Sequence, residues 1–432
     1  MADGMKQEEL EYAALIGLDW AHEQHVVSIM DTASGRKSTA TVEHSPAALQ
    51  EWVNGLREKY PGRKVALALE QSRGPVVYAL MDYEIFDIYP INPVAMSSFR
   101  KTLATSGAKD DPTDAELIRM LLEKHRDRLR RLVLDDALTR KIRLLCEKRR
   151  KIVDIRTSLS NRLIAVLKEY YPQALTLIGR NTGGMMSCEF LNKWPTLEDL
   201  QRAREETIKR FYYHHKCRSN KRIQERLKLI REERPLTQDE PIMEASKMMA
   251  LALCKQLRQL NASVLQFDKA IEKAFEDHED RRIFRSFPGA GDCLAPRLMS
   301  VFGTDRDRWE DATDVQKFSG IAPVISRSGK SLWIHKRYAC PIFIRQSFQE
   351  FAGASIKYSV WSRAYYDQQR DRGAGHQAAL RSLAFKWIRI IFRCWKKREE
   401  YDEVKYLQAL KKAGSDVLNY IGAKPVHAPA GG

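Results

Sequence analysis

Four acidic residues have the side-chain type and the placement needed to bind divalent cations. Asp19 and Glu70 each end an apolar run that is expected to form a buried strand. Asp111 and Asp114 are three residues apart, and Pro112 suits the first turn of a helix, so both carboxylates leave one helix face. A desolvated carboxylate is costly unless it is paired or bound to metal. The four acids therefore predict a site for two divalent cations, Mg²⁺ or Mn²⁺, that promotes phosphodiester chemistry.

A second group of reactive side chains lies far along the chain, in a loop rich in hydroxyls. A serine near several cations could attack a phosphodiester, because nearby positive charge stabilises its alkoxide. Such serines could equally bind phosphate or shape a turn, and the residues alone leave both interpretations open. The serines are Ser326, Ser328 and Ser331, and the cations are Arg327, Lys330, Lys336 and Arg337.

A short glycine motif precedes this loop. The segment Phe287–Gly291 reads Phe-Pro-Gly-Ala-Gly and resembles one turn of a helix-hairpin-helix. In such a turn, Gly289 and Gly291 would expose backbone N–H groups at a helix start, which suits a DNA phosphate. The alternative is an ordinary corner between two helices.

The apolar patterns of residues 12–125 predict the elements that must position the four acids. Three strands in succession form an antiparallel meander, and a helix, a strand, a second helix and a further strand follow. With the helix of Asp111 and Asp114 added, this is the order of an RNase H-like (RuvC-like) α/β fold, in which the first strand and a later central strand bring their acids together. The strands are predicted over residues 12–20, 25–30, 37–42, 65–69 and 85–89, and the helices over 47–60 and 74–83.

Residues 126–280 are predicted to form a basic helical arm. A helix from about residue 117 to 171 has apolar residues near heptad spacing, and a second seam runs from Leu253 to Ile271 in steps of four and three. The two are expected to pair as an antiparallel coiled coil, with an irregular insertion over about 173–241. Within it, the basic, aromatic run 212–222 suits stacking on unpaired bases, or else is a solvated helix with a few core aromatics.

The rest of the chain divides into a mainly α domain and a tail. Residues 281–415 contain the glycine motif, the serine loop and long apolar helices, and residues 416–432 are predicted to be disordered.

Composition narrows the class of partner and compartment. The 432-residue chain has a net charge of +17, which favours a polyanionic partner, most simply nucleic acid. Its seven cysteines are scattered and include no Cys-x-x-Cys pair, which argues against a disulfide framework and structural zinc and favours a reducing cytoplasm. No apolar run approaches the roughly 20 residues that span a bilayer, so no membrane partner is expected.

The order of these motifs resembles a known family, the DEDD transposases of the IS110 family of insertion sequences. The resemblance covers most of residues 12–400 and implies a RuvC-like domain, a coiled-coil arm and a C-terminal transposase domain. The matching segments are Gly17–Trp20, Leu69–Glu70, Gly107–Ala115, Phe287–Gly291 and Ala322–Ser331.

The resemblance also implies roles for single residues. Asp19, Glu70, Asp111 and Asp114 match the family's metal-binding acids. The neighbouring Asp110 offers an alternative ligand.

A serine of the C-terminal loop matches the family's nucleophile, which becomes covalently attached to DNA. Ser328, immediately before Gly329, is the best match, and Ser326 and Ser331 remain alternatives.

The resemblance further implies partners. Family members use a structured noncoding bridge RNA whose loops pair with target and donor DNA. They act as dimers or tetramers, in which the acids of one subunit can complete a site with the serine of another, at the bacterial nucleoid. The segment 173–241 is longer than in a typical member and could be an added RNA- or DNA-binding piece.

Three functions follow from these observations. The first is a recombinase that cuts and rejoins DNA strands, an activity that should require Ser328. The second is a RuvC-like nuclease, such as a Holliday junction resolvase, which uses metal-activated water and should tolerate Ser328→Ala. The third is a non-catalytic nucleic-acid-binding protein, which should tolerate Asp19→Ala.

Overall fold

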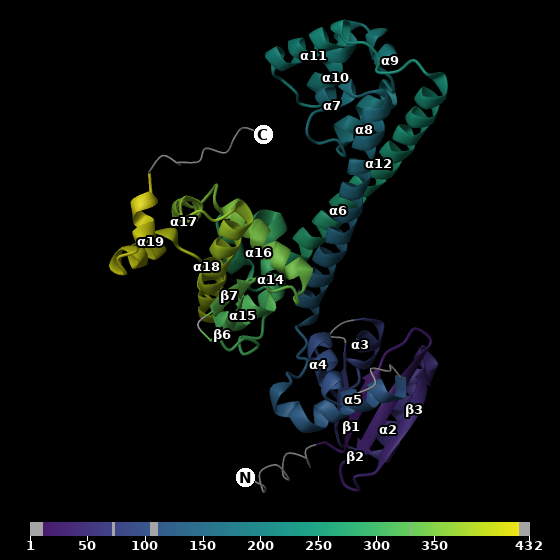
Figure 1. Cartoon of the computed structure of the whole chain (residues 1–432), viewed down its shortest axis with the longest axis vertical. Helices are drawn as coiled ribbons and strands as arrows, with labels where there is room; N and C mark the ends of the chain where they lie inside the picture. The colour runs from purple at the N-terminus through teal and green to yellow at the C-terminus, as the bar shows by residue number, and fades with distance from the viewer. Residues whose placement is uncertain (1–11, 71–73, 104–110, 330, 423–432) are drawn as a thin grey trace. The chain divides into compact units, whose positions relative to one another are not determined.

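The chain forms two compact units (Figure 1). The computed structural model describes residues 12–70, 74–103, 111–329 and 331–422. The first unit ends at Leu134 and the second begins at Asp135. The extended segment that follows residue 125 still packs with the first unit. There, the Leu132 amide donates to the Ile88 carbonyl at 2.7 Å, and Arg131 pairs with Asp87 at 3.2 Å.

The first unit is built on a five-stranded sheet with the order β3-β2-β1-β4-β5. The first three strands pair antiparallel in a meander, whereas β1, β4 and β5 are parallel, which confirms the predicted α/β character of this region. The strands are β1 (Ala14–Asp19), β2 (Gln24–Asp31), β3 (Lys37–Glu43), β4 (Val65–Leu69) and β5 (Phe86–Pro90).

Helices cover both faces of this sheet. On one face, α2 (Pro46–Lys59) and α3 (Pro75–Leu80) share a core with the even-numbered residues of β1, and the Ser45 side chain caps α2 as predicted. On the other face, α4 (Pro93–Leu103) and α5 (Asp111–His125) pack on the odd-numbered residues.

The helix predicted over 117–171 is in fact two helices. α5 ends at His125, and α6 (Ala137–Tyr170) begins only after a short 3-10 turn and an extended segment. The break occurs where the chain passes from the first unit to the second.

Two long helices, α6 and α12 (Glu240–Glu276), lie side by side in the second unit (Figure 1). Arg149 forms an ion pair with Asp268, and Arg156 donates to Asn261 at 3.2 Å. Residue numbers rise along α6 as those of its partners fall along α12, so the two helices are antiparallel, as predicted.

The segment between these helices is helical, so the prediction of irregular structure over 173–241 is wrong. Each of its helices is too short to show a clear apolar period, yet together with α6 and α12 they enclose a separate core. Tyr212 is fully buried there and donates to the Leu177 carbonyl at 3.1 Å, which favours the core interpretation of the aromatic run over base stacking. The helices are α7 (Gln173–Ile178), α8 (Met185–Lys193), α9 (Leu197–Gln201), α10 (Glu205–His214) and α11 (Asn220–Glu232).

The remainder of the second unit is a helical body around three fully buried tryptophans, Trp361, Trp387 and Trp395. The same core includes Ile142 of α6 and Phe275 of α12, so the long helices are rooted in the body. The helices are α13 (Arg281–Arg285), α14 (Gly291–Phe302), α15 (Ala312–Phe318), α16 (Ile342–Ser355), α17 (Val360–Asp371), α18 (His376–Lys397) and α19 (Glu403–Lys412), and the hairpin strands are β6 (Val324–Ser328) and β7 (Ser331–His335).

The described chain continues past the predicted start of the tail. Asp416–Tyr420 forms a 3-10 turn, and Val417 is buried in the body core, so disorder from residue 416 is a wrong prediction for this part. Residues 423–432 lie outside the described residues. In the described parts of the chain, every helix is too short or too polar to cross a membrane.

Candidate functional site

Asp19 and Glu70 are brought together by strand register. β1 and β4 are parallel neighbours, and their last paired residues are Leu18 and Leu69. Asp19 directly follows Leu18, and Glu70 directly follows Leu69; both acids are half-buried. Because residues in register on parallel neighbours share a face, both carboxylates belong to the sheet face covered by α5. The carboxyl ends of parallel strands are a common location for ligand sites.

Gly17 allows the helix α5 to lie directly on β1. A Cβ at this position would overlap the Ala115 carbonyl oxygen and would lie 2.9 Å from the Arg119 Cα. Gly17 and Asp19 are two residues apart and therefore share a face. The close contact between helix and strand thus occurs beside the residue that carries the first predicted ligand.

The direction of α5 places Asp114 at the same end of the sheet. Ala115, the residue after Asp114, packs on Gly17 near the end of β1. Beyond the other end of α5, the Arg126 guanidinium is 5.1 Å from the centroid of the Tyr12 ring, just before β1 begins. The helix therefore runs antiparallel to β1, and its N-terminus, the positive end of the helix dipole, lies at the Asp19 end.

Asp114 is buried and paired. The residue is 3% exposed, and its carboxylate forms an ion pair with Arg100 of α4, which compensates the cost of burying the charge. Arg100 was not singled out from the sequence, because nothing in its local pattern shows a contact with a carboxylate fourteen residues later.

The structure describes the remaining acids, Asp110 and Asp111, only in part. The side chain of Asp111 and the whole of Asp110 are outside the described residues, although the backbone of Asp111 begins α5. Among the described residues, no three His, Cys, Asp or Glu side chains are grouped so as to hold a metal ion. The donors that are described, carboxylate oxygens at one sheet edge, are of the type that Mg²⁺ and Mn²⁺ prefer.

The serine loop is a two-stranded antiparallel hairpin. Ser328 pairs with Ser331, and Gly329, which follows Ser328, has a φ of +58°, which favours glycine. Lys330 itself lies outside the described residues. The three predicted serines are all exposed.

All three serines share one face of this hairpin. In an antiparallel pair, alternate residues of each strand and their partners point to the same side. Since Ser326 pairs with Trp333 and Val324 with His335, this side contains five polar or aromatic side chains. We call it the serine face; its members are these five, Ser326, Ser328, Ser331, Trp333 and His335, together with Val324.

Of the positively charged residues predicted to assist the serines, those that the structure describes do not belong to the serine face. Arg327 is paired with Leu332 and belongs to the opposite face, so it does not point along the serines. Arg337 is half-buried, and its Nε donates to the Ala322 carbonyl at 3.4 Å, where it fixes the base of the hairpin. Lys336 is exposed, with its Nζ 5.5 Å from the centroid of the Tyr338 ring.

The two glycines of the Phe287–Gly291 motif have different surroundings. Gly289 has a φ of +83°, and a Cβ there would lie 2.9 Å from the Ala354 carbonyl carbon, so this glycine permits close packing on α16. Gly291 is exposed at the start of α14, with open space around the position of a Cβ. The next residue, Asp292, pairs with Arg285 at 3.1 Å and places a carboxylate at the same helix N-terminus.

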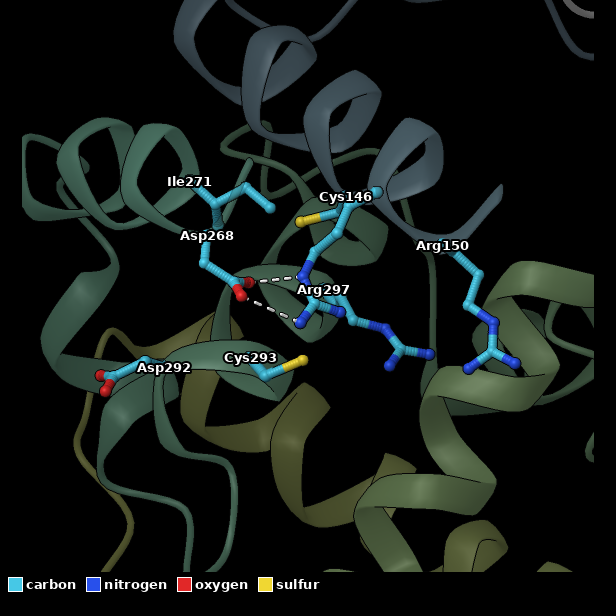
Figure 2. Close-up of a pocket in the computed structure, with 8 residues that line it drawn as sticks. Cys146, Arg150, Asp268, Ile271, Asp292, Cys293 and Arg297 are labelled. Carbon is cyan, nitrogen blue, oxygen red and sulfur yellow. Dashed lines mark hydrogen bonds and ion pairs between the residues drawn. The ribbon is translucent and has the colours of Figure 1, made fainter. Parts of the chain in front are cut away.

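A small hollow lies where α6, α12 and α14 meet (Figure 2). It has room for about one water molecule. Its arginines are compensated by acids, since Arg149 pairs with Asp268, and Arg150 pairs with Glu350 at 3.1 Å. The hollow is therefore a polar joint between the long helices and the body rather than a substrate site.

Comparison with known proteins adds independent information about both sites. A family model described as a transposase, of the DEDD IS110 type, matches residues 16–172. A second model, described as transposase IS116/IS110/IS902 family, matches residues 281–367. The first contains the acids at the sheet edge and the second contains the serine hairpin, and together they span more than half of the chain.

Whole-length similarity agrees with these matches. A protein of Streptomyces coelicolor, named for a transposase of the IS117 mini-circle, is 28% identical over 411 residues, which cover 92% of this chain and 98% of that protein. The 43.6 kDa protein of insertion element IS110, also from Streptomyces coelicolor, is 24% identical over 288 residues, covering 66% and 70%. The chain therefore belongs to the IS110 family of DNA transposases.

Proposed function

We propose that this transposase cuts and rejoins DNA strands through a serine of the β6–β7 hairpin and a metal-binding acidic site on an RNase H-like domain. The observation that carries the proposal is the placement of Asp19 and Glu70 in register at the ends of β1 and β4, with the N-terminus of α5 at the same edge. The strand order β3-β2-β1-β4-β5, with one antiparallel meander, supports the RNase H-like assignment.

The serine step is a transesterification. The Ser328 Oγ forms a bond to the scissile phosphorus while the bond from phosphorus to one neighbouring sugar oxygen breaks, and the serine proton ends on that oxygen. A hydroxyl of another strand reverses the step and releases the serine. One ester is exchanged for another each time, so no external energy source is required.

The acidic residues would hold the divalent ions. Asp19, Glu70, Asp111 and Asp114 are the proposed ligands, and the ions, when bound, would neutralise the charge that develops on the phosphate. Asp114 must exchange its ion pair with Arg100 for a metal contact, while the N-terminus of α5 favours negative charge at this edge.

The proposed partners are donor DNA, target DNA and a noncoding guide RNA, with a homodimer or tetramer as the working unit. The net charge of +17 supports a polyanionic partner. Lys330, Lys336 and Arg327 are proposed to contact phosphates, as are the amides at Gly291. Residues 12–125, 126–280 and 281–415 are the proposed catalytic, arm and transposase domains.

A metal nuclease of the RuvC kind is the second candidate. It is favoured by one observation: within the described chain, no hydrogen bond joins the side chain of Ser326, Ser328 or Ser331 to another residue, so no base is seen to activate them. A nuclease would instead release hydrolysed ends with the acids alone.

Trapping the covalent intermediate tests the proposal. Purified protein is incubated with DNA, Mg²⁺ and the RNA that copurifies with it, and denaturation-resistant adducts are measured. We expect an adduct that disappears in Ser328→Ala and in Asp19→Ala but persists in Ser326→Ala and Ser331→Ala. Cut DNA without an adduct, and unchanged cutting by Ser328→Ala, would establish the nuclease instead.

A further inference from the structure

Trp333 is the one exposed tryptophan among the eight of this chain, all of which the structure describes. Its side chain is 62% exposed, while Trp361, Trp387 and Trp395 are fully buried. A large exposed aromatic side chain marks an interaction site more often than an exposed small apolar one, because burying its large apolar surface stabilises a complex more.

The register places this indole beside the candidate nucleophiles. Trp333 is directly opposite Ser326 and diagonal to Ser328 on the serine face. Directly opposed side chains have Cβ atoms about 5 Å apart, and diagonal neighbours are about 7–8 Å apart, within reach of an aromatic ring. His335 is a further neighbour on this face, and its ring centroid is 6.3 Å from that of Trp333.

The charge around the hairpin complements a polyanion. Residues 315–349 contain six lysines and arginines and no aspartate or glutamate. A basic run with an exposed aromatic side chain is the usual composition of a surface that follows a nucleic-acid backbone and stacks on its bases.

We propose that the serine face is a base-stacking site for the DNA strand that is cut. The Trp333 indole stacks on an unpaired base next to the scissile phosphate and thereby sets which phosphate faces Ser328. This inference rests on the proposed function for the identity of the reacting strand. In a duplex, neighbouring bases cover both faces of each base, so the site selects a base that has left the stack.

The opposite face of the hairpin supplies a matched control. Ile334 is adjacent to Trp333 in sequence, is 66% exposed and is paired with Ile325, which is 58% exposed. Ile334→Ala therefore removes a comparably exposed side chain from the same strand without touching the serine face.

Fluorescence of a base analogue tests the stacking directly. The full-length protein is titrated into a single-stranded DNA that contains 2-aminopurine, and into the duplex of the same sequence. We expect quenching by the wild type and by Ile334→Ala, weaker quenching by Trp333→Phe, and none by Trp333→Ala. Trp333→Ala should bind the single strand roughly tenfold more weakly, within the range of base–aromatic stacking, and bind the duplex unchanged.

Three outcomes would overturn the inference. One is single-strand binding and quenching by Trp333→Ala equal to the wild type. Another is an equal loss in Ile334→Ala, which would show that the whole hairpin, not its serine face, is needed. The third is tighter, Trp333-dependent binding of an RNA of the same sequence, which would assign the site to RNA.

The adduct assay separates this inference from the proposed function. If Trp333-dependent quenching occurs but no adduct forms with any DNA, the serine mechanism fails and the stacking site stands. If the adduct forms at the same phosphate and rate in Trp333→Ala, the stacking site fails and the serine mechanism stands. If both are correct, Trp333→Ala forms less adduct or spreads it over neighbouring phosphates.

Discussion

Asp19 extends from a strand that is buried along its length between two layers of helices, whereas Ser328 extends from a hairpin whose described side chains are nearly all exposed. The first residue is held by strand register, by the close contact at Gly17 and by a helix terminus. The second is held by one pair of strands, and an isolated hairpin is marginally stable. We infer that the acids are positioned before substrate arrives, while binding completes the ordering of the serines.

The largest effect is expected where the acid site is most tightly built. Gly17→Ala would force a Cβ into the backbone of α5 at Ala115 and Arg119, so the helix must move away from β1. We expect a loss of about 3 kcal/mol or more in the free energy of unfolding of the first unit, at the upper end of overpacking effects. Chemical denaturation with tryptophan fluorescence measures this loss.

Gly55→Ala is the matched control for this substitution. Gly55 lies inside α2, with open space around the position of a Cβ. Alanine there should stabilise the unit by about 0.5–1 kcal/mol, because glycine is a poor helix former. Equal stability of the two variants would show that α5 is not seated on β1 as described.

Acid should weaken the acid-bearing unit through His25. This side chain is fully buried in β2, and burial, reinforced by the nearby His44, lowers its pKa from 6.5 to about 4. The folded state therefore binds its proton less readily than the unfolded state. The stability that this provides is complete above about pH 6.5 and is lost as the pH falls toward 4, by roughly 2–3 kcal/mol.

Unfolding at pH 7.5 and pH 4.5 measures this dependence. His25→Gln should reduce the difference between the two pH values, while His22→Gln, at an exposed position before β2, should not. An unchanged difference in His25→Gln would assign the acid sensitivity to other groups.

A smaller effect is expected at the ion pair of Asp114. Arg100→Ala leaves a buried carboxylate without this partner, and because the arginine is partly exposed we expect a loss of about 1–2 kcal/mol in the absence of metal. Mg²⁺ should then raise the melting temperature more in Arg100→Ala than in the wild type, since no guanidinium competes for Asp114. Lys101→Ala, on the same helix and exposed, is the control. If Mg²⁺ raised the melting temperature equally in all three proteins, Asp114 would not be a metal ligand.

The two regions also differ in how far the sequence predicts them. The adjacency of Asp19 and Glu70 was predictable, because each ends an apolar strand and neighbouring parallel strands bring such ends together. The contact of Gly17 with α5 and the pairing of Arg100 were not, since both join residues whose separation in the chain carries no local pattern.

The serine region was predicted as a loop, although it is a hairpin. The sequence between its two strands is Gly-Lys, not the Asn-Gly or Asp-Gly pair that most clearly signals a two-residue turn. In each strand, however, these side chains are two residues apart: Ser326 and Ser328 in one strand, Ser331 and Trp333 in the other. A strand interpretation of both segments would therefore have placed the indole and the serines on one face.

The smallest predicted effect compares the β2–β3 hairpin, which is part of the buried sheet, with the exposed β6–β7 hairpin. Gly35 ends the turn between β2 and β3 with a φ of +66°, and Gly329 has a φ of +58°; a Cβ would meet no atom at either position. Alanine should introduce a similar backbone strain of about 1 kcal/mol at both. In Gly35→Ala this strain should lower the free energy of global unfolding, because β2 is integral to the buried sheet. In Gly329→Ala it should leave global unfolding unchanged and instead speed amide hydrogen exchange in residues 324–335, with less serine adduct, because that hairpin opens without the core. Equal global destabilisation by both substitutions would mean that the serine hairpin is as firmly supported as the sheet, and the acids and serines would then be equally pre-organised.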